Sequence, residues 1–423
     1  MLTQTPRGTK DLYGPEAASW RAVEDMIRAL CADFCLNEIR TPIFEHTELF
    51  ARSAGDTSDV VQKEMYTFTD KGGRSISLRP EGTAGVARAF VEHGLHAGGL
   101  PVKLFYIGPN FRYEKPAAGR WRQHHQFGVE IFGSYSPAAD AEVISLAHMM
   151  LARLGVSDSV SLHINSLGGK ECRAAYNERL HAFIADNLDA LCPTCRERAV
   201  INPLRILDCK DEKCRALLGA APEPIDSLGA ECRAHLEALL AFLDMMKIVY
   251  TVNPRLVRGF DYYTRTVFEF IDGKTGLALP AGGRYDGLIE QCGGAPTGGV
   301  GFGSGMERLM MVLEREGKLP GTDAGVRVFV GSAGEKGLAK SREVAYRLRR
   351  AGIPCECDIM ERSVKAQMKH ADKLRAEYSL ILGDDEIASG TVAVRNMATG
   401  EKTEVEIDRL EEALINLKAR KNG

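Results

Sequence analysis

The chain has 423 residues, of which 44% are hydrophobic and 26% are charged, and its formal net charge is −3. This length exceeds one ordinary hydrophobic core, so two or three domains are expected, and the balanced composition excludes a disordered or collagen-like chain. The small net charge neither supports nor excludes a nucleic-acid partner, because phosphate contacts depend on local basic patches.

The cysteines and the N-terminus both bear on where the protein works. An odd number of cysteines, eleven, is scattered over the chain, and the first residues, MLTQTPRGTKDLYGPE, contain no apolar core. We therefore expect reduced thiols rather than a disulfide framework, and neither a secretory signal nor an anchor. No later stretch approaches the ~18 apolar residues of a membrane span. The expectation is a cytoplasmic protein with no membrane partner.

The first expected element is an amphipathic helix that begins near Pro15 and ends before Pro42. Its apolar residues recur every three or four positions, and they are Trp20, Val23, Ile27, Leu30 and Phe34. Two later segments, VKLFYIG (Val102 to Gly108) and QFGVEIFG (Gln126 to Gly133), are bounded by glycine or proline and are rich in aromatic and β-branched residues. These features predict strands.

A helical stretch rich in cysteine, alanine and leucine runs from about residue 169 to about residue 245. Strand patterns resume at Lys247 to Thr251 and at Thr266 to Ile271, so we interpret the helical stretch as an insertion. After a helix in MERLMMVLEREG, the unpatterned segment LPGTDAG is expected to be a linker. The remainder favours a compact α/β domain, with strands in VRVFVG, IPCECD and YSLILG and helices at Arg342 to Arg350 and Ser363 to Ala376.

The segment FRYEKPAAGRWRQHHQFGVEIFG predicts two strands joined by a basic loop. Alternation along the second strand places Gln126, Gly128 and Glu130 on one face and apolar residues on the other. A polar face with a gap over Gly128 is typical of a pocket wall, because buried polar groups need partners that a ligand can supply. A hairpin with a solvated outer face fits the same alternation.

The segment GGVGFGSGMERLMM places a glycine-rich strand end before a helix that carries Arg308. Glycines allow close approach, and a guanidinium can bind a phosphate through paired hydrogen bonds. The spacing fits neither a Rossmann loop nor a P-loop. Tight packing of a helix on a strand is the alternative interpretation.

Four cysteines of the insertion, Cys192, Cys195, Cys209 and Cys214, have the spacing C-x2-C, thirteen residues, C-x4-C. This is close to the pattern of a structural Zn²⁺ site. Free thiols in a helical insertion are the alternative.

Three of these elements in order, RTPIFE with Pro42, the FRYE hairpin and GFGSGMERL, resemble the three motifs of class II aminoacyl-tRNA synthetases. Between the second and third lie RGFDYYT (Arg258 to Thr264) and AGGRYDGL (Ala281 to Leu288), which resemble the two signatures of histidyl-tRNA synthetases. The resemblance covers essentially the whole chain. It implies an α+β catalytic core with an antiparallel sheet over residues 1–325, carrying the helical insertion, and a C-terminal α/β anticodon-binding domain over residues 326–423.

The resemblance also implies an activity. A homodimer, formed through the Pro42 motif, would activate L-histidine with ATP and Mg²⁺ to histidyl-adenylate and would then transfer the histidyl group to the 3′ terminal adenosine of tRNA(His). Because a carboxylate must meet a phosphate, negative charge needs neutralisation on both sides. Catalysis would fall to Arg112 and Arg258, and ATP binding to Arg112, Glu114 and Arg308.

Histidine binding would fall to a set of residues from several segments: Glu81, Thr83, Gln126, Glu130, Arg258, Tyr263 and Tyr285. A site that binds both edges of an imidazole rejects other side chains by up to ~10⁴-fold, so no editing domain is expected. In the loop GRWRQHH, Arg120 and Arg122 flank Trp121 and are candidates for contact with the acceptor end of the tRNA. The loop tip carries Ala117 and Ala118 where many family members have longer polar side chains, a departure that bears on how the extra 5′ nucleotide is read.

Two rival functions share the core. One is the non-catalytic paralogue that regulates ATP phosphoribosyltransferase, which is expected to lack the C-terminal domain and catalytic arginines. The other is a class II synthetase for another amino acid. The retained Arg112, Arg258 and Arg308 disfavour the first rival, and the two histidyl signatures disfavour the second.

Overall fold

The computed structural model describes residues 3–55, 58, 60–209, 211–321 and 326–419. The chain divides into two compact units, Met1–Pro320 and Gly321–Gly423. The segment expected to be a linker, LPGTDAG, spans this division, and its residues 322–325 lie outside the described part. Each unit has its own sheet and its own hydrophobic core.

The first unit is built on a sheet of eight strands in the order β1-β5-β6-β11-β10-β9-β7-β8. Neighbours from β5 to β7 are antiparallel, while β1 and β8 add parallel edges. The expected antiparallel core is therefore confirmed. The strands are β1 (Asn37–Glu38), β5 (Val102–Phe111), β6 (Gln123–Phe132), β7 (Val160–Ser166), β8 (Thr251–Val252), β9 (Thr264–Asp272), β10 (Ala278–Arg284) and β11 (Gly299–Gly305).

One face of this sheet packs on four helices: α1 (Gly14–Asp33), α4 (Pro137–Arg153), α8 (Ala230–Met245) and α10 (Met306–Arg315). The predicted helix from Pro15 is α1, and its periodic apolar residues Trp20, Val23, Ile27 and Leu30 are buried in this layer. From the sheet, Phe127, Val129 and Ile131 of β6 join the same core. The alternation predicted for this strand is therefore confirmed, and its polar face points away from the four helices.

The opposite face carries a smaller core with α3 (Thr83–Glu92) and α9 (Leu288–Gln291). Nearby elements are α2 (Thr47–Ala54), the π-helical turn η1 (Val60–Glu64) and a three-stranded sheet ordered β2-β4-β3. Its strands are β2 (Phe44–His46), β3 (Thr67–Thr69) and β4 (Ser75–Leu78). This side of the large sheet is open enough to hold a site, because the helices here are fewer and shorter.

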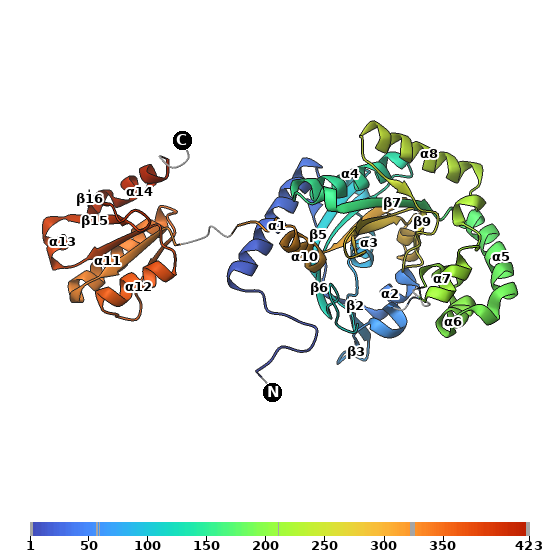
Figure 1. Cartoon of the computed structure of the whole chain (residues 1–423), viewed down its shortest axis with the longest axis horizontal. Helices are drawn as coiled ribbons and strands as arrows, with labels where there is room; N and C mark the ends of the chain where they lie inside the picture. The colour runs from blue at the N-terminus through green and yellow to red at the C-terminus, as the bar shows by residue number, and fades with distance from the viewer. Residues whose placement is uncertain (1–2, 56–57, 59, 210, 322–325, 420–423) are drawn as a thin grey trace. The chain divides into compact units, whose positions relative to one another are not determined.

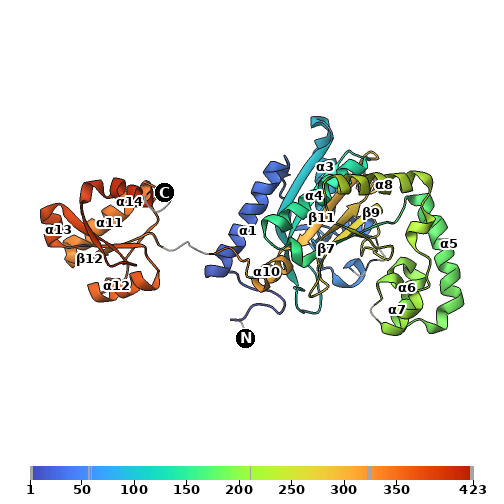
Figure 2. The same ribbon diagram turned by 45° about the horizontal axis from the view of Figure 1, so that its top comes forward.

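The helical insertion lies where the sequence predicted it. It contains α5 (Lys170–Asn187), α6 (Pro193–Ile201), the 3-10 turn η5 (Pro203–Asp208), α7 (Glu212–Leu218) and α8. Figures 1 and 2 show α5, α6 and α7 gathered beside the sheet, and this group has a hydrophobic core of its own. We call residues 170–221 the cysteine lobe. The last helix, α8, packs along α4 instead.

One predicted strand is wrong. Residues Lys247 to Thr251 do not form a strand; β8 contains only Thr251–Val252. Lys247 has φ of 59°, the left-handed conformation that ends α8, and a strand cannot start from it.

The second unit is a five-stranded sheet in the order β13-β12-β14-β15-β16, parallel from β13 to β14 and antiparallel beyond. The predicted alternation corresponds to β12 (Val328–Ser332), α11 (Gly334–Arg350), β13 (Cys355–Cys357), α12 (Val364–Lys373) and β14 (Tyr378–Leu382). The α/β expectation is confirmed. The chain continues through α13 (Asp384–Ser389), β15 (Thr391–Asn396), β16 (Lys402–Glu406) and α14 (Leu410–Ala419). Across the described residues of both units, every helix is too short or too polar to cross a membrane.

Candidate active site

A cavity of about 700 Å³ lies over the sheet face that carries Gln126 and Gly303. A smaller cavity of about 160 Å³ adjoins it. Both are lined by Arg112, Glu114, Arg120, Gln126, Arg258 and Arg308, so they form two parts of one site. The lining comes from segments almost two hundred residues apart, which only the sheet brings together.

Three arginines expected to act on a nucleotide all reach this site. Arg112 follows β5, and its Nε donates a hydrogen bond to the carbonyl of Pro80 at 2.8 Å. Arg308 lies in the first turn of α10, and it donates to the carbonyls of Gly119 and Ala278, each at 3.0 Å. These backbone carbonyls hold the two guanidinium groups in place but carry no net charge. Both guanidinium groups therefore bring positive charge to the cavity wall.

Arg258 enters the site from the loop before β9 and forms an ion pair with Glu269 of that strand. Its guanidinium also lies 5.6 Å from the centre of the Tyr263 ring. Burial alone would lower the pKa of Arg258, but the Glu269 carboxylate and the neighbouring phenols outweigh burial and raise the pKa. Arg258 is therefore a fixed cation.

Several cations of the site lie close enough to repel one another. Burial lowers the pKa of Arg308, and the neighbouring cations Arg120 and Arg112 lower it further against the opposing effects of Glu114 and Glu269. Burial likewise lowers the pKa of His124 to about 3, with Arg112 and Arg308 adding to the shift. Cations that depress one another's pKa are stabilised by a bound anion, so the site favours an anionic ligand.

Glu114 faces this cluster of cations. Its carboxylate lies 3.5 Å from Arg120 and 3.9 Å from Arg112, and within the described residues its buried Oε2 accepts no hydrogen bond. A buried acceptor without a hydrogen bond is costly unless a ligand supplies the donor.

Two buried acids lie on the other side of the site. Glu81 accepts hydrogen bonds from the amides of Thr83 at 2.6 Å and Ala84 at 2.8 Å, at the start of α3, and burial raises its pKa. Burial raises the pKa of Glu130 to about 8, and the nearby Glu81 carboxyl adds to that shift. A pKa of about 8 leaves Glu130 largely protonated near neutral pH.

Glu130 lies beneath the cavity rather than along its wall. It is 0% exposed, it accepts a hydrogen bond from the Tyr285 hydroxyl, and the Tyr106 hydroxyl lies 3.4 Å away. The absence of a side chain at Gly301 makes room for this Glu130–Tyr285 pair. Sequence reasoning found Glu130 and Tyr285 but not the tyrosine of β5 that packs beside them.

The gap predicted over Gly128 is not part of the cavity. The ring of Tyr106 occupies it, because any side chain at Gly128 would overlap that ring. The polar face of β6 is nonetheless enclosed, since Gln126 is half-buried and Glu130 fully buried. The alternative of a solvated outer face is therefore wrong.

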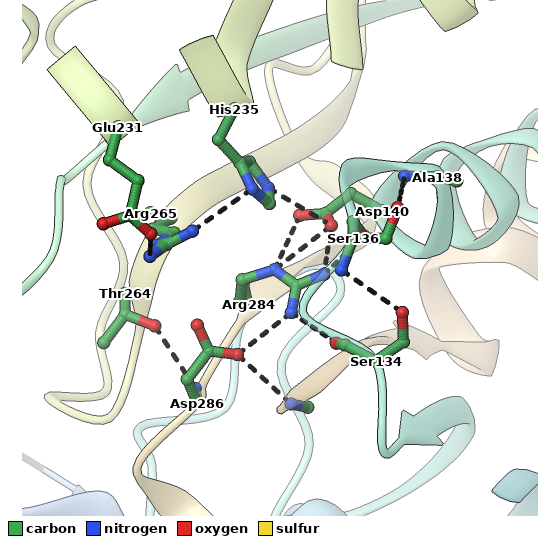
Figure 3. Close-up of polar contacts among 11 residues, drawn as sticks. Ser134, Ser136, Ala138, Asp140, Glu231, His235, Thr264, Arg265, Arg284 and Asp286 are labelled. Atoms are coloured by element: carbon green, nitrogen blue, oxygen red, sulfur yellow. Dashed lines mark hydrogen bonds and ion pairs between the residues drawn. The ribbon is translucent and has the colours of Figure 1, made fainter. Parts of the chain in front are cut away.

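The second signature segment is held from behind by a buried ionic network (Figure 3). Arg284 of β10 and Asp140 of α4, both 0% exposed at the side chain, form an ion pair. Arg284 also donates to Asp286 at 3.0 Å, and His235 of α8 lies 3.4 Å from Asp140. Because strand neighbours point to opposite faces, fixing Arg284 here directs Tyr285 towards Glu130.

With this geometry in place, comparisons with known proteins give the family. A family model described as histidyl-tRNA synthetase matches residues 8–309, and one described as an anticodon binding domain matches residues 326–417. The histidine–tRNA ligase of Caldanaerobacter subterraneus subsp. tengcongensis is 50% identical over 418 residues, covering 98% of this chain and 100% of that protein. The chain belongs to the histidyl-tRNA synthetase family.

Further relatives extend the match over the full length. The histidine–tRNA ligase of Acetivibrio thermocellus is 49% identical over 413 residues, covering 97% of this chain and 99% of that protein. The crystal structure of apo S. aureus histidyl-tRNA synthetase has a TM-score of 0.83 at 38% identity, covering 97% of this chain and 99% of that one. An ATP phosphoribosyltransferase regulatory subunit/histidyl-tRNA synthetase from Bacillus halodurans C has a TM-score of 0.65 at 21% identity, covering 90% of this chain and 99% of that one, and shares the fold.

Of the remaining residues that the family resemblance predicts for the site, all but Arg122 line the cavity. Thr83, Tyr263 and Arg120 line the site, with Trp121 and His124. Arg122 lies elsewhere: its guanidinium is 4.0 Å from the centre of the Tyr113 ring, and its Nε donates to the Glu114 carbonyl at 3.3 Å. Arg122 therefore supports the loop that carries Glu114 and Arg120.

Among the lining residues that sequence reasoning missed, three are charged or titratable groups of particular interest: Glu269, His124 and Arg205. His124 lies two positions before Gln126 on β6, Glu269 lies on β9 outside the recognised motifs, and Arg205 of the cysteine lobe reaches the cavity from outside the core. For Glu269, the alternation of β9 was a usable signal, because a glutamate between Phe268 and Phe270 must point to the face opposite them. The four predicted metal ligands do come together: their sulfur atoms all lie within 4.8 Å of one another.

Proposed function

We propose that this chain activates L-histidine with ATP and Mg²⁺, forming histidyl-adenylate and pyrophosphate, and then transfers the histidyl group to the 3′ terminal adenosine of tRNA(His). It acts in the cytoplasm as a homodimer. The observation that carries the proposal is the meeting of Arg112, Arg258 and Arg308 in one cavity beside two buried acids. The full-length identity to curated histidine–tRNA ligases supports the choice of amino acid and tRNA.

The cations and Glu114 define the ATP side. Arg112 and Arg258 lie where two guanidinium groups can flank the α-phosphate and the attacking histidine carboxylate, and Arg308 binds the far end of the triphosphate. Glu114 accepts a hydrogen bond from the adenine amino group, which supplies the donor that its buried Oε2 lacks within the described residues. Bound Mg²⁺ would neutralise phosphate charge.

The acids and phenols define the histidine side. Glu81 and Thr83 bind the amino group and one edge of the ring, while Gln126 and Tyr263 complete the wall of the pocket. Glu130, paired with Tyr285 beneath the cavity, is the candidate acceptor of a hydrogen bond from the N–H of the far ring nitrogen. Because one ring nitrogen of neutral imidazole donates and the other accepts, a site that pairs both edges rejects isosteric side chains.

Basic residues suggest where the tRNA binds, and exposed apolar residues suggest where the second subunit binds. Arg120 and Trp121 line the smaller cavity, where the acceptor end must enter, and Arg122 fixes the shape of their loop. The C-terminal unit binds the anticodon, as the match to that domain family suggests. For the dimer, Ile43 and Phe44 beside Pro42 are 44% and 54% exposed, which favours a partner surface there.

The regulatory paralogue is disfavoured. The Bacillus halodurans structure shares the core fold, so the fold cannot distinguish the two functions. The arginine cluster can, because a binding protein does not need it.

The deciding experiment is ATP–pyrophosphate exchange with each of the amino acids in turn. Histidine should drive exchange, and every other amino acid should fall below it by orders of magnitude. Exchange with another amino acid but not with histidine would overturn the proposed specificity. Exchange with no amino acid would favour the regulatory role instead.

A further inference from the structure

The cysteine lobe brings four thiols together from separate turns of the chain. Cys192 precedes α6, Cys195 lies in its first turn, Cys209 follows η5, and Cys214 lies in α7. All four sulfur atoms lie within 4.8 Å of one another, and those of Cys192 and Cys209 are 3.7 Å apart. A tetrahedron of zinc–sulfur bonds of ~2.3 Å places the sulfur atoms about 3.8 Å apart. The cluster already has nearly that size.

The donor set fits one class of ion. All four groups are sulfur, with no carboxylate or imidazole among the described residues of the cluster, and four thiolates in a tetrahedron are typical of structural Zn²⁺. The thiols are free rather than bridged. Four free cysteines are not expected to cluster without a ligand, because contacts between thiols stabilise a fold only weakly.

The lobe also needs a cross-link. Within the described part of the chain, its separate core consists of ten buried residues, and Cys195 and Cys214 are two of them. Short helices over so small a core are stabilised little by packing, so metal binding supplies folding free energy directly.

The segment between the two cysteine pairs reaches the first signature loop. Asn202 donates from Nδ2 to Oδ1 of Asp261 at 2.6 Å, and Arg205 donates to the carbonyl of Gly259 at 3.2 Å. Residues 196–208 are closed at both ends by the cluster, so whatever fixes the sulfur atoms fixes these contacts too. Cys192 and Cys209 themselves line the larger cavity, with Arg258.

We propose that Cys192, Cys195, Cys209 and Cys214 bind one structural Zn²⁺, and that this ion holds the cysteine lobe against residues 258–263 at the edge of the active site. The first part is independent of the proposed reaction. The second is a statement about structure and can be measured without turnover.

The first test is metal analysis of the full-length chain purified under reducing conditions. We expect about one Zn²⁺ per chain, and replacement by Co²⁺ should give the visible absorption of tetrahedral thiolate-bound cobalt. Cys192→Ser and Cys209→Ser should each lose most of the metal. The matched control is Cys172→Ser, in α5 of the same insertion but outside the cluster, and it should keep the full amount.

Two results would overturn the metal site: less than roughly 0.2 Zn²⁺ per chain with no uptake when the reduced protein is titrated with Zn²⁺, or equal metal content in Cys192→Ser and Cys172→Ser. Iron at full occupancy would overturn the identity of the ion. Since a serine variant can fail by misfolding, the same protein is also stripped with a chelator and reloaded.

Hydrogen exchange of the loaded and stripped protein tests the second part. Removing the metal should speed amide exchange in residues 196–208 and 258–263 together, by roughly tenfold or more, while the C-terminal unit stays unchanged. Reloading should restore both segments. Faster exchange confined to the lobe, with residues 258–263 unaffected, would refute the link to the active site and leave the metal site standing.

Discussion

The ion pair between Arg258 and Glu269 yields the sharpest prediction for the mechanism. Both side chains are mostly buried, 18% and 17% exposed, and Glu269 lines the same cavity as Arg258. Arg258→Ala removes one preorganised cation, so adenylate formation should fall by roughly 10² to 10³, or about 3 to 4 kcal/mol. It also leaves the Glu269 carboxylate without its partner, which should cost about 1 to 3 kcal/mol of stability.

A double variant separates these two effects. Glu269→Gln removes the negative charge, so Arg258→Ala/Glu269→Gln should recover most of the lost stability. It should not recover the rate, because glutamine supplies no cation. Glu269→Gln alone keeps the cation and should retain far more activity than Arg258→Ala.

The assay is pyrophosphate exchange at saturating histidine and ATP, with single-turnover adenylate formation and urea unfolding on the same preparations. Arg255→Ala is the matched control. It removes an arginine three positions earlier that is 41% exposed at the side chain and lies 3.7 Å from Glu223, and its rate should stay near normal. If the double variant regains rate and stability together, Arg258 acts only through folding, and the electrostatic argument fails.

Three further perturbations test other parts of the site. Burial raises the pKa of Glu130 to about 8 in the folded protein. The contribution of protonated Glu130 to the free energy of unfolding is therefore fully present below its ordinary pKa and is lost as pH rises through 8. In thermal unfolding, the Tm of Glu130→Gln should therefore rise relative to that of the wild type between pH 5 and pH 9. A Tm difference that stays constant over this range would contradict the prediction. Asp140→Asn should destabilise the first unit by about 3 kcal/mol in urea, because it removes the fully buried carboxylate and leaves Arg284 with Asp286 as its remaining anion; a loss under 1 kcal/mol would argue against the network. Arg308→Ala should raise KM for ATP by roughly tenfold or more and leave KM for histidine nearly unchanged, whereas equal increases in both would place Arg308 outside the ATP side.

Local patterns were enough to predict most elements. The spacing from Trp20 to Leu30 predicted α1, and alternation in β6 assigned its apolar residues to the core. These signals work because helix and strand periods are properties of neighbouring residues. The hairpin of β15 and β16 was not predicted, because Ala393 between Val392 and Val394 breaks the apolar–polar alternation of a half-buried strand.

Long-range packing was not accessible in the same way. Tyr106 fills the space over Gly128 because β5 and β6 pair in a register that places these two residues opposite each other. Arg284 meets Asp140 across 144 positions of sequence. A single sequence indicates that a buried arginine needs an anion but not which one, so the pocket could be predicted as a set of residue types and not as a set of contacts.

The two halves of the candidate site are supported by different parts of the molecule. On the ATP side, carbonyls of the core hold Arg112 and Arg308, through Pro80, Gly119 and Ala278. On the histidine side, both signature segments are contacted from behind by the insertion: His235 of α8 joins the Arg284 network, and Asn202 binds Asp261. Because the cysteine lobe has its own small core, whereas α8 packs in the main core of the first unit, the local stability of the lobe is separate from that of the sheet. Loosening the cysteine lobe is therefore expected to act first on the segment Arg258 to Tyr263, through the contact of Asn202 with Asp261, while Arg112 and Arg308 keep their backbone supports.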